Sequence, residues 1–372
     1  MQEIYKQRQF KVIISGGGTG GHIFPAIAIA DALKKRIIDV DILFVGAKGK
    51  MEMTKVPAAG YPIEGLWISG LQRKLTLKNL SFPFKVISSL AKANKIINRF
   101  RPDLVIGVGG FASGPTLRVA AKKRITTLIQ EQNSFPGITN KLLSKKVDKI
   151  CVAYEGMDRF FPKNKIVLTG NPVRQEVIDI EGKKKDALKF FKLEANKKTI
   201  LVVGGSQGAV SINKSIHKYL DLIVKNDHQL IWQTGKFYFE TATEAINKFE
   251  GKQIKVVEFI DRMDYAYSAA DILVSRAGAI AISEICAVGK PTIFVPLPSA
   301  AEDHQTKNAQ ALVEKNAAIL IPNKKINEKL GEAIINLIKD EKKQNEFSTN
   351  LNKLAIKNAA DRIVDEIEKL IK

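Results

Sequence analysis

The chain repeats one pattern that strongly limits its fold: a short apolar run, a turn, and then a longer helical stretch. The apolar runs are rich in Val, Ile and Leu and are mostly continuous rather than alternating. Continuous runs of this length are typical of parallel strands that are buried on both faces. Regular alternation of such strands with helices indicates α/β layers joined by right-handed crossovers. We therefore predict the α/β class, with doubly wound parallel sheets.

The pattern also starts twice. KVIISGGGTGG at residues 11–21 and TILVVGGSQG at residues 199–208 each read as a strand that ends in a glycine-rich turn. The repetition predicts two similarly built domains joined near residues 170–174, with a ligand site in the cleft between them, at the carboxyl ends of the strands. The candidate strands are 11–15, 41–46, 104–109, 127–131, 149–154 and 166–169 in the first half, and 199–204, 230–233, 254–259, 272–275, 292–295 and 318–321 in the second.

Three strand ends in the first half carry residues suited to chemistry. GGGTGGH at residues 16–22 offers backbone N–H groups to an anion, and His22 is either a general base or a brace for its own loop. GVGGFASG at residues 107–114 is a second glycine-rich strand end. QEQN at residues 130–133 offers one carboxylate and three amides, which suit sugar hydroxyls or cap the loop. A dinucleotide site would also need an acid at the end of the second strand, and residues 45–47 supply none.

The second half offers a complementary set of polar groups. Ser206 in GGSQG can donate to a phosphate oxygen, or it simply caps the following helix. Arg174 would place a permanent positive charge near a diphosphate. Glu284, early in a predicted helix, can accept hydrogen bonds from a ribose diol, or it is merely a favourable acid near a helix start. Gln305 and Asn308 are three residues apart and share a face if their segment is helical.

The positive charge is concentrated in the first half. The formal net charge is +21; residues 1–172 hold 28 basic and 11 acidic residues, whereas residues 173–372 hold 31 and 27. This skew favours an anionic partner for the first half: phosphates, nucleic acid or an anionic membrane surface.

One basic and apolar segment stands out between Glu64 and Asp103. It contains eight basic residues and no acid, interleaved with leucines and phenylalanines. Such a segment can lie on an anionic bilayer, or its helix simply packs on the first sheet. Nucleic acid is disfavoured because no known binding module accompanies it. The residues predicted to face a membrane are Leu75, Leu80, Phe82, Phe84, Lys85 and Lys92.

Composition excludes several other classes. The chain is 45% hydrophobic and 26% charged, which argues against a disordered or fibrous protein. Prolines interrupt its longest apolar run, and the first eleven residues lack an apolar signal core, so neither a membrane span nor export is expected. Cys151 and Cys286 are predicted to be core thiols in a reducing compartment. No His, Cys or Asp cluster has metal-ligand spacing, so no metal or other cofactor is predicted.

Eight motifs, in this order, resemble those of the MurG-type N-acetylglucosaminyltransferases of peptidoglycan synthesis. They are GGGTGGH, GVGGFASGP, QEQN, GNPVR, GGSQGA, EFIDRM, RAGA followed by SE, and DHQTKNA. The resemblance covers nearly the whole chain. It implies a GT-B fold, in which two Rossmann-like domains face a deep cleft. We accordingly assign residues 1–170 to an acceptor and membrane-side domain, 171–350 to a UDP-GlcNAc-binding domain, and 351–372 to a helix that packs back toward the first domain.

The resemblance also implies an activity. N-acetylglucosamine would move from UDP-GlcNAc to the 4-hydroxyl of MurNAc in lipid I (undecaprenyl-pyrophosphoryl-MurNAc-pentapeptide), with inversion and without a metal, to give lipid II. The enzyme would lie peripherally on the cytoplasmic face of the membrane, with a cell-wall synthesis complex as a further potential partner and no nucleic acid.

Site residues follow from the motifs by this resemblance. His22 matches the favoured general-base candidate, and Glu131 is the second choice. Glu284 would hold the ribose hydroxyls, Ile260 the uracil and Ser206 the phosphates. Gln305 and Asn308 would face the sugar. The other donor-site positions are Thr19, Gly20, Gly21, Asn133, Arg174, Ala279, Ile280, Ala281, Ile282 and Ser283.

Two positions depart from the family pattern, and rival interpretations remain. Gln130 replaces the usual histidine before Glu-Gln-Asn, and Phe111 replaces the usual tyrosine after Gly-Gly. A UDP-GlcNAc 2-epimerase of the same fold is the main alternative. An NAD-dependent enzyme and a non-catalytic binder of anionic surfaces are further ones.

Overall fold

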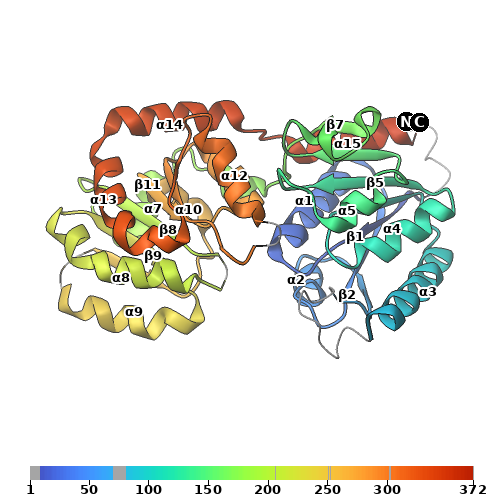
Figure 1. The fold of residues 1–372 in the computed structure, drawn as a ribbon, viewed down its shortest axis with the longest axis horizontal. Helices are drawn as coiled ribbons and strands as arrows, with labels where there is room; N and C mark the ends of the chain where they lie inside the picture. Colours follow the sequence, from blue (N-terminus) through green and yellow to red (C-terminus); the bar gives the residue numbers. More distant parts are fainter. Residues whose placement is uncertain are drawn as a thin grey trace. The chain divides into compact units, whose positions relative to one another are not determined.

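The computed structural model describes residues 9–69, 81–205, 207–249, 251, 253–300 and 303–371. It divides into two compact units. The first comprises Met1–Val173 and Ile356–Lys372, and the second Arg174–Ala355. In Figure 1, the elements from β1 to β7, coloured blue to green, and the C-terminal helix α15 belong to the first unit, and the elements from α7 to α14 belong to the second.

The first unit is built on a parallel sheet. Among the described residues it has seven strands in the order β3-β2-β1-β4-β5-β6-β7, and every pairing is parallel. All six predicted strands are present, although several end one or two residues earlier than expected. The strands are β1 (Lys11–Ser15), β2 (Asp41–Ala47), β3 (Ile63–Leu66), β4 (Leu104–Gly107), β5 (Thr126–Glu131), β6 (Lys149–Val152) and β7 (Ile166–Leu168).

The sequence analysis missed β3. Its four residues, IEGL, include a glutamate and a glycine, and both are poor strand formers. The strand forms at the edge of the sheet, where pairing with β2 decides its conformation.

Helices cover both faces of this first sheet. Val12 and Ile14 of β1 pack with α1, α2 and α15, while Ile13 packs with α3, α4 and α5 on the other face. The helices are α1 (Gly20–Arg36), α2 (Glu52–Ala58), α3 (Phe82–Phe100), α4 (Ser113–Lys122), α5 (Ile138–Leu143) and α15 (Ala359–Leu370), with short 3₁₀ turns at Met157–Arg159 and Lys163–Lys165. Buried Cys151 is a free thiol in this core, as predicted.

The second unit repeats the plan. Its described residues form a six-stranded parallel sheet in the order β10-β9-β8-β11-β12-β13. All six strands expected from the sequence form. They are β8 (Thr199–Val203), β9 (Gln229–Gln233), β10 (Ile254–Val257), β11 (Ile272–Ser275), β12 (Thr292–Phe294) and β13 (Ile319–Leu320).

Two helical layers enclose this second sheet. One face packs against α8, α9 and α13, and the other against α7, α10, α11 and α12. The helices are α6 (Gln175–Ile178), α7 (Lys184–Phe191), α8 (Val210–Lys225), α9 (Phe239–Ile246), α10 (Met263–Ala269), α11 (Ala279–Val288), α12 (His304–Val313), α13 (Ile326–Lys339) and α14 (Glu341–Leu354). Short 3₁₀ turns lie at Lys236–Tyr238, Asn247–Phe249 and Asn323–Lys325. Cys286 is likewise buried and free.

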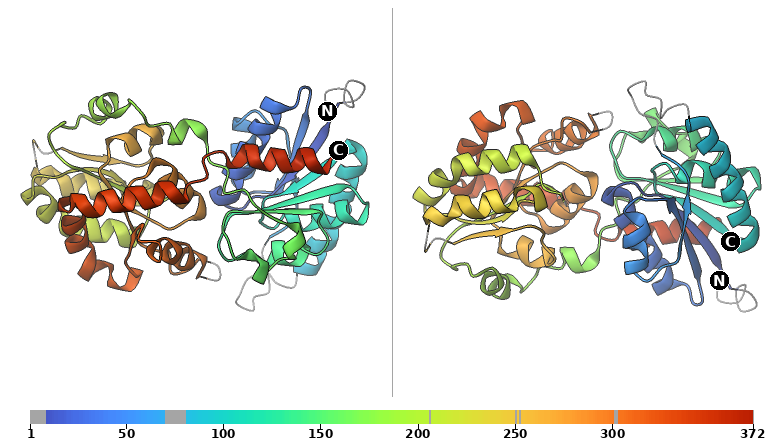
Figure 2. Two further views of the ribbon diagram at one scale, coloured as in Figure 1. Left: turned by 90° about the horizontal axis from the view of Figure 1, so that it is seen from above. Right: turned by 90° about the horizontal axis from the view of Figure 1, so that it is seen from below.

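The last helix, α15, returns to the first unit. Ile363, Val364 and Ile367 are fully buried in the core that α1 shares with β1, and Figure 2 shows α15 lying along the first unit. Arg36 at the end of α1 pairs with Asp361, Asp365 and Glu368. The first sheet is therefore covered on one face by a segment from the far end of the chain.

This packing predicts that Ile367→Ala destabilises the first unit. Removing a fully buried isoleucine should lower the unfolding free energy by about 2–5 kcal/mol, because a cavity remains in the core. Denaturant unfolding of the full chain measures the change, and Lys357→Ala, at an exposed position, is the control. Equal stability of the two variants would contradict this packing.

Candidate functional site

The predicted site residues of the first unit gather at the carboxyl edge of its sheet. Strands β1, β4 and β5 are neighbours and parallel, so the loops that follow them meet at one edge. These loops carry the GGGTGGH, GVGGFASG and QEQN motifs. Strand β2 pairs on one side of β1 and β4 on the other, so the direction of the crossovers reverses at β1. Doubly wound sheets bind ligands at such a switch point.

The glycine-rich loop after β1 is held by a buried glutamate. Glu52, at the start of α2, accepts a hydrogen bond from the Gly18 N–H at 2.9 Å and another from the Ala47 N–H at 3.0 Å. Its side chain is 1% exposed. Sequence analysis missed Glu52 because it lies outside every recognised motif; an acid among apolar residues after the second strand was its only signal.

Helix α1 begins directly after this loop. Thr19 is its N-cap, and the His22 and Ile23 N–H groups bond to the Thr19 carbonyl. The first turn contains Gly20 and Gly21 and no acidic side chain. The positive end of the helix dipole is therefore not neutralised from within its own first turn.

His22 contacts the third loop. Its Nδ1 lies 3.0 Å from Oε1 of Gln132, and its ring packs beside Gly109 of the second loop. The predicted general-base candidate is thus joined to both other loops. Gln132 was noted in the sequence only as one of three amides.

Glu131 is buried and braces the loop that follows it. Oε1 accepts from the backbone N–H and the side-chain amide of Asn133, at 3.0 and 3.2 Å. Oε2 accepts from the Gly137 N–H at 3.2 Å and from Asn140 at 2.8 Å. Burial raises the pKa of Glu131, and these hydrogen bonds oppose that effect.

The second unit presents its own glycine-rich loop at the carboxyl edge of its sheet. Backbone packing around this loop is tight: a Cβ on Gly208 would lie 1.8 Å from the Thr234 carbonyl oxygen, at the end of β9. Gln233 donates to the Gly205 carbonyl at 2.9 Å. Helix α8 starts just after the loop. Ser206 lies outside the described residues.

Arg276, directly after β11, supports the region around this loop. Its guanidinium donates to the Val295 and Pro296 carbonyls, to Asn323 and to Ser211 in the first turn of α8. Desolvation lowers the pKa of Arg276. We interpret this residue as a brace that ties the ends of β11 and β12 to the start of α8.

Glu284 lies in a cluster with Arg174 and Tyr267. The Tyr267 hydroxyl donates to Oε2 of Glu284 at 3.0 Å. Desolvation raises the pKa of Glu284 to about 7, while the charge of Arg174 and the tyrosine hydrogen bond act to lower it. Sequence analysis placed Arg174 and Glu284 in one site but missed Tyr267, which lies in α10 outside the recognised motifs.

The remaining candidates of the second unit lie on α11, on α12 and after β10. Gln305 and Asn308 are both in α12, so the condition under which they share a helix face is met. Oε1 of Gln305 accepts from the Leu297 N–H at 2.9 Å, and Asn308 is fully buried. Ile260 is 8% exposed. Helix α11 begins at Ala279 and contains Ile280, Ala281, Ile282, Ser283 and Glu284.

The described part of the basic and apolar segment contains the end of β3 and the helix α3. Phe84 and Ile87 on this helix are 69% and 65% exposed, and Trp67 nearby is 51% exposed. Phe82 is partly buried. Leu75 and Leu80 lie outside the described residues. Lys85 donates to Ser69, and Lys92 donates to the Gly65 carbonyl at 2.8 Å, so both lysines also hold α3 against the end of β3.

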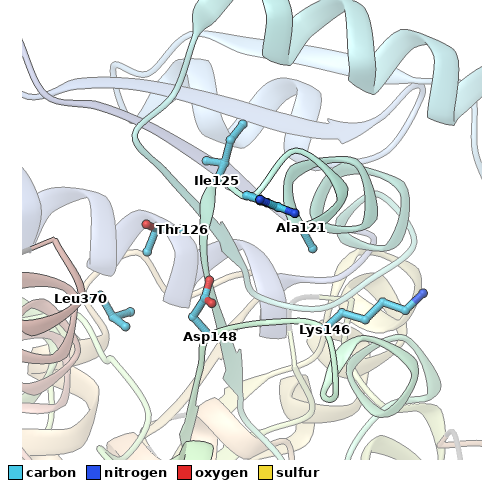
Figure 3. Close-up of a pocket in the computed structure, with 7 residues that line it drawn as sticks. Ala121, Ile125, Thr126, Lys146, Asp148 and Leu370 are labelled. Carbon is cyan, nitrogen blue, oxygen red and sulfur yellow. The ribbon is translucent and has the colours of Figure 1, made fainter.

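A separate pocket of about 330 Å³ lies at the opposite edge of the first sheet. Its lining comes from the end of α4, the start of β5, the turn before β6 and the end of α15 (Figure 3). These segments meet at the amino ends of the strands, and none of the predicted site residues lines the pocket. Within the described residues, no group of three or more His, Cys, Asp or Glu could hold a metal ion, and no helix is long and apolar enough to cross a bilayer.

Comparison with known proteins finds relatives along nearly the whole chain. The Glycosyltransferase family 28 N-terminal domain matches residues 12–152, and the family 28 C-terminal domain matches residues 199–363. Two curated proteins, from Flavobacterium psychrophilum and Parabacteroides distasonis, are 57% and 54% identical to this chain. The matches cover 98% of this chain and 98% and 99% of those proteins. Both are named UDP-N-acetylglucosamine–N-acetylmuramyl-(pentapeptide) pyrophosphoryl-undecaprenol N-acetylglucosamine transferase.

Solved structures share the architecture. The crystal structure of Acinetobacter baumannii MurG matches with a TM-score of 0.77 at 29% identity, covering 97% of this chain and 99% of that one. UDP-GlcNAc 2-epimerase from Neisseria meningitidis matches with a TM-score of 0.68 at 16% identity, covering 97% and 100%. The epimerase likeness shows the fold alone. The predicted GT-B class, with two Rossmann-like parallel-sheet domains, is confirmed.

Proposed function

The chain belongs to the family of UDP-N-acetylglucosamine–N-acetylmuramyl-(pentapeptide) pyrophosphoryl-undecaprenol N-acetylglucosamine transferases, and from that membership we propose its reaction. The enzyme transfers N-acetylglucosamine from UDP-GlcNAc to the MurNAc 4-hydroxyl of lipid I and so forms lipid II. Identity of 57% over 98% of the chain carries this proposal. The epimerase alternative is not favoured, because the epimerase structures match at only 14–16% identity.

The second unit is assigned to the donor. A carboxylate at Glu284 accepts hydrogen bonds from the ribose hydroxyls, and Arg174 beside it supplies positive charge. The glycine-rich loop at the start of α8, with Ser206, is assigned to the diphosphate, because a helix start favours negative charge. Ile260 is assigned to the uracil, and Gln305 with Asn308 to the sugar. Ala279, Ile280, Ala281, Ile282 and Ser283 complete the donor-side set on α11.

The first unit is assigned to the acceptor. Thr19, Gly20 and Gly21 at the start of α1, and Asn133 on the loop after β5, are assigned to contacts with the donor. His22 takes the proton of the attacking hydroxyl. Glu131 is assigned to hold the loop that carries Asn133, because each of its oxygens already accepts two hydrogen bonds.

The step is a single displacement with inversion. The acceptor oxygen forms a bond to the anomeric carbon while the bond from that carbon to the UDP oxygen breaks, and its electron pair leaves with UDP. The hydroxyl proton passes to the His22 imidazole. Negative charge then develops on the diphosphate, where the start of α8 and Arg174 stabilise it.

We expect this enzyme to transfer labelled N-acetylglucosamine from UDP-GlcNAc to a short-chain lipid I analogue in the presence of EDTA. Chromatography of the lipid product measures disaccharide formation. Absence of product would contradict the proposed function, provided that the protein is folded and another enzyme confirms that the analogue is competent. Turnover of UDP-GlcNAc without any acceptor would instead indicate an epimerase.

Binding of UDP is expected to weaken as pH falls through about 7. The ribose hydroxyls need the ionised form of Glu284, and the pKa of this carboxyl is about 7. The ionised fraction, and with it the association constant, should fall up to about tenfold between pH 8 and pH 6. Calorimetric titration with UDP measures it, so titration of His22 does not interfere through the chemical step.

Variants separate this effect from general pH dependence. Glu284→Gln should bind UDP more weakly at pH 8 and should lose the part of the pH dependence that Glu284 contributes, because it cannot ionise. The terminal phosphate of UDP, with a second pKa of about 6, titrates equally with every variant. Glu244→Gln, at an exposed glutamate of α9, should keep the wild-type profile. A Glu284→Gln profile that matched the wild type would exclude Glu284 as the titrating group.

The exposed apolar patch of the first unit is assigned to the cytoplasmic surface of the membrane. Phe84, Ile87 and Trp67 are exposed in a unit that carries most of the net positive charge. Apolar side chains that enter the headgroup region, together with surrounding Lys and Arg, bind anionic bilayers peripherally. Lys85 and Lys92 support this patch by fixing α3, besides contributing charge.

The double substitution Phe84→Ser and Ile87→Ser should reduce binding to phosphatidylglycerol-containing vesicles several-fold, because less apolar area enters the bilayer. Co-sedimentation measures the bound fraction, and transfer to a soluble acceptor analogue should be unchanged. Ile38→Ser is the matched control, since Ile38 is 76% exposed in the same unit but lies outside the patch. Equal binding of both proteins would remove the patch from the membrane contact.

A further inference from the structure

The amide of Gln132 has a defined orientation. Its Nε2 lies 2.8 Å from the Val108 carbonyl oxygen and 3.3 Å from the Gln130 carbonyl oxygen. Carbonyl oxygens only accept hydrogen bonds, so the NH₂ group must face them. The side chain is 1% exposed, and the opposite amide orientation would place two acceptors against each other in a buried position. Oε1 of Gln132 therefore faces His22.

Two further amides enforce the same direction. Asn171 donates from Nδ2 to the Gln132 carbonyl at 3.0 Å, which directs its Oδ1 to Nε2 of Gln130, also at 3.0 Å. Oε1 of Gln130 in turn accepts from Nε2 of Gln132. All three side chains are buried. Each donor in this network points away from His22, and fixed backbone carbonyls set the direction at both ends.

The orientation determines where the imidazole carries its proton. Nδ1 of His22 lies 3.0 Å from Oε1 of Gln132, an atom that only accepts, so Nδ1 must be the donor. A neutral imidazole has one N–H, which leaves Nε2 as its basic nitrogen. The ring position is also restricted, because a Cβ on Gly109 would lie 2.8 Å from its Cε1.

We propose that Gln132 is a positioning residue that holds neutral His22 as the Nδ1–H tautomer, so that Nε2 accepts the proton of the attacking hydroxyl. The catalytic consequence rests on the proposed function, whereas the tautomer itself does not. Gln132 thus performs with a neutral amide the orienting task that a carboxylate performs beside histidine in hydrolase triads. The network behind it extends this role to Gln130 and Asn171.

Long-range ¹H–¹⁵N NMR on the full-length protein with ¹⁵N-labelled histidine tests the tautomer directly. The chain has four histidines, and His22→Gln identifies the His22 signals. At a pH where the ring is neutral, wild-type His22 should show a protonated Nδ1 and an unprotonated Nε2. A protonated Nε2 in the wild type would overturn the proposal without any variant at Gln132.

Variants at Gln132 test the positioning role. Gln132→Leu removes the acceptor, so the Nε2–H form should appear and kcat should fall about 10- to 100-fold, while the KM for UDP-GlcNAc stays constant. Gln132→Glu should keep the Nδ1–H form. Its second oxygen would face the Val108 and Gln130 carbonyls, so the carboxyl should be protonated on that oxygen and present its carbonyl oxygen to His22. The acidic limb of the kcat profile should therefore stay close to that of the wild type.

A matched control and the activity of the wild type make the outcomes distinguishable. Gln229→Leu removes a similarly buried amide at the start of β9 in the second unit and should change neither the tautomer nor the acidic limb. An unchanged His22 tautomer in folded Gln132→Leu would overturn the proposal. A third outcome is that Gln132→Leu loses the Nδ1–H form but the wild type fails to transfer N-acetylglucosamine. That outcome would support the positioning role of Gln132 and reject the proposed function.

Discussion

Buried and partly buried polar side chains hold the loops at the carboxyl edges of both sheets, and the candidate site depends on them. A parallel sheet brings loops from several strands to one edge, but it does not fix their conformations. Here Glu52 holds the loop after β1, Glu131 the loop after β5, and Arg276 the loops beside the start of α8. A charge buried in this way is stable only when hydrogen bonds satisfy it, so each brace enforces one loop geometry.

Glu284 differs from these braces, and the difference supports the binding role proposed for it. Glu52 and Glu131 accept hydrogen bonds from backbone N–H groups that belong to the loops they hold. Glu284 is partly exposed, accepts from the Tyr267 hydroxyl, and has a pKa raised by desolvation to about 7. A carboxylate in a poorly solvated position gains more from a ligand's hydroxyl groups than a saturated one does.

Much of this arrangement could be predicted from the sequence, because the strands are local apolar runs and the loops carry distinctive glycines. Twelve strands follow from those runs, whereas β3 depends on its neighbour and has little apolar signal of its own. The motifs pointed to His22, Arg174 and Glu284, which are proposed to react or bind. They missed Glu52, Tyr267 and the role of Gln132, because a supporting residue is defined by what it contacts across the fold.

The departure at Gln130 changes the chemistry of the support behind His22. The family pattern has histidine at this position, and here a buried amide donates to Asn171 and accepts from Gln132. An amide has its donor and acceptor on one planar group and does not change charge near neutral pH. In this chain, therefore, the described network behind His22 consists of three neutral amides, Gln130, Gln132 and Asn171, with a fixed direction. In the proposed mechanism, the proton passes to the His22 imidazole, and the orientation of that ring depends on these amides.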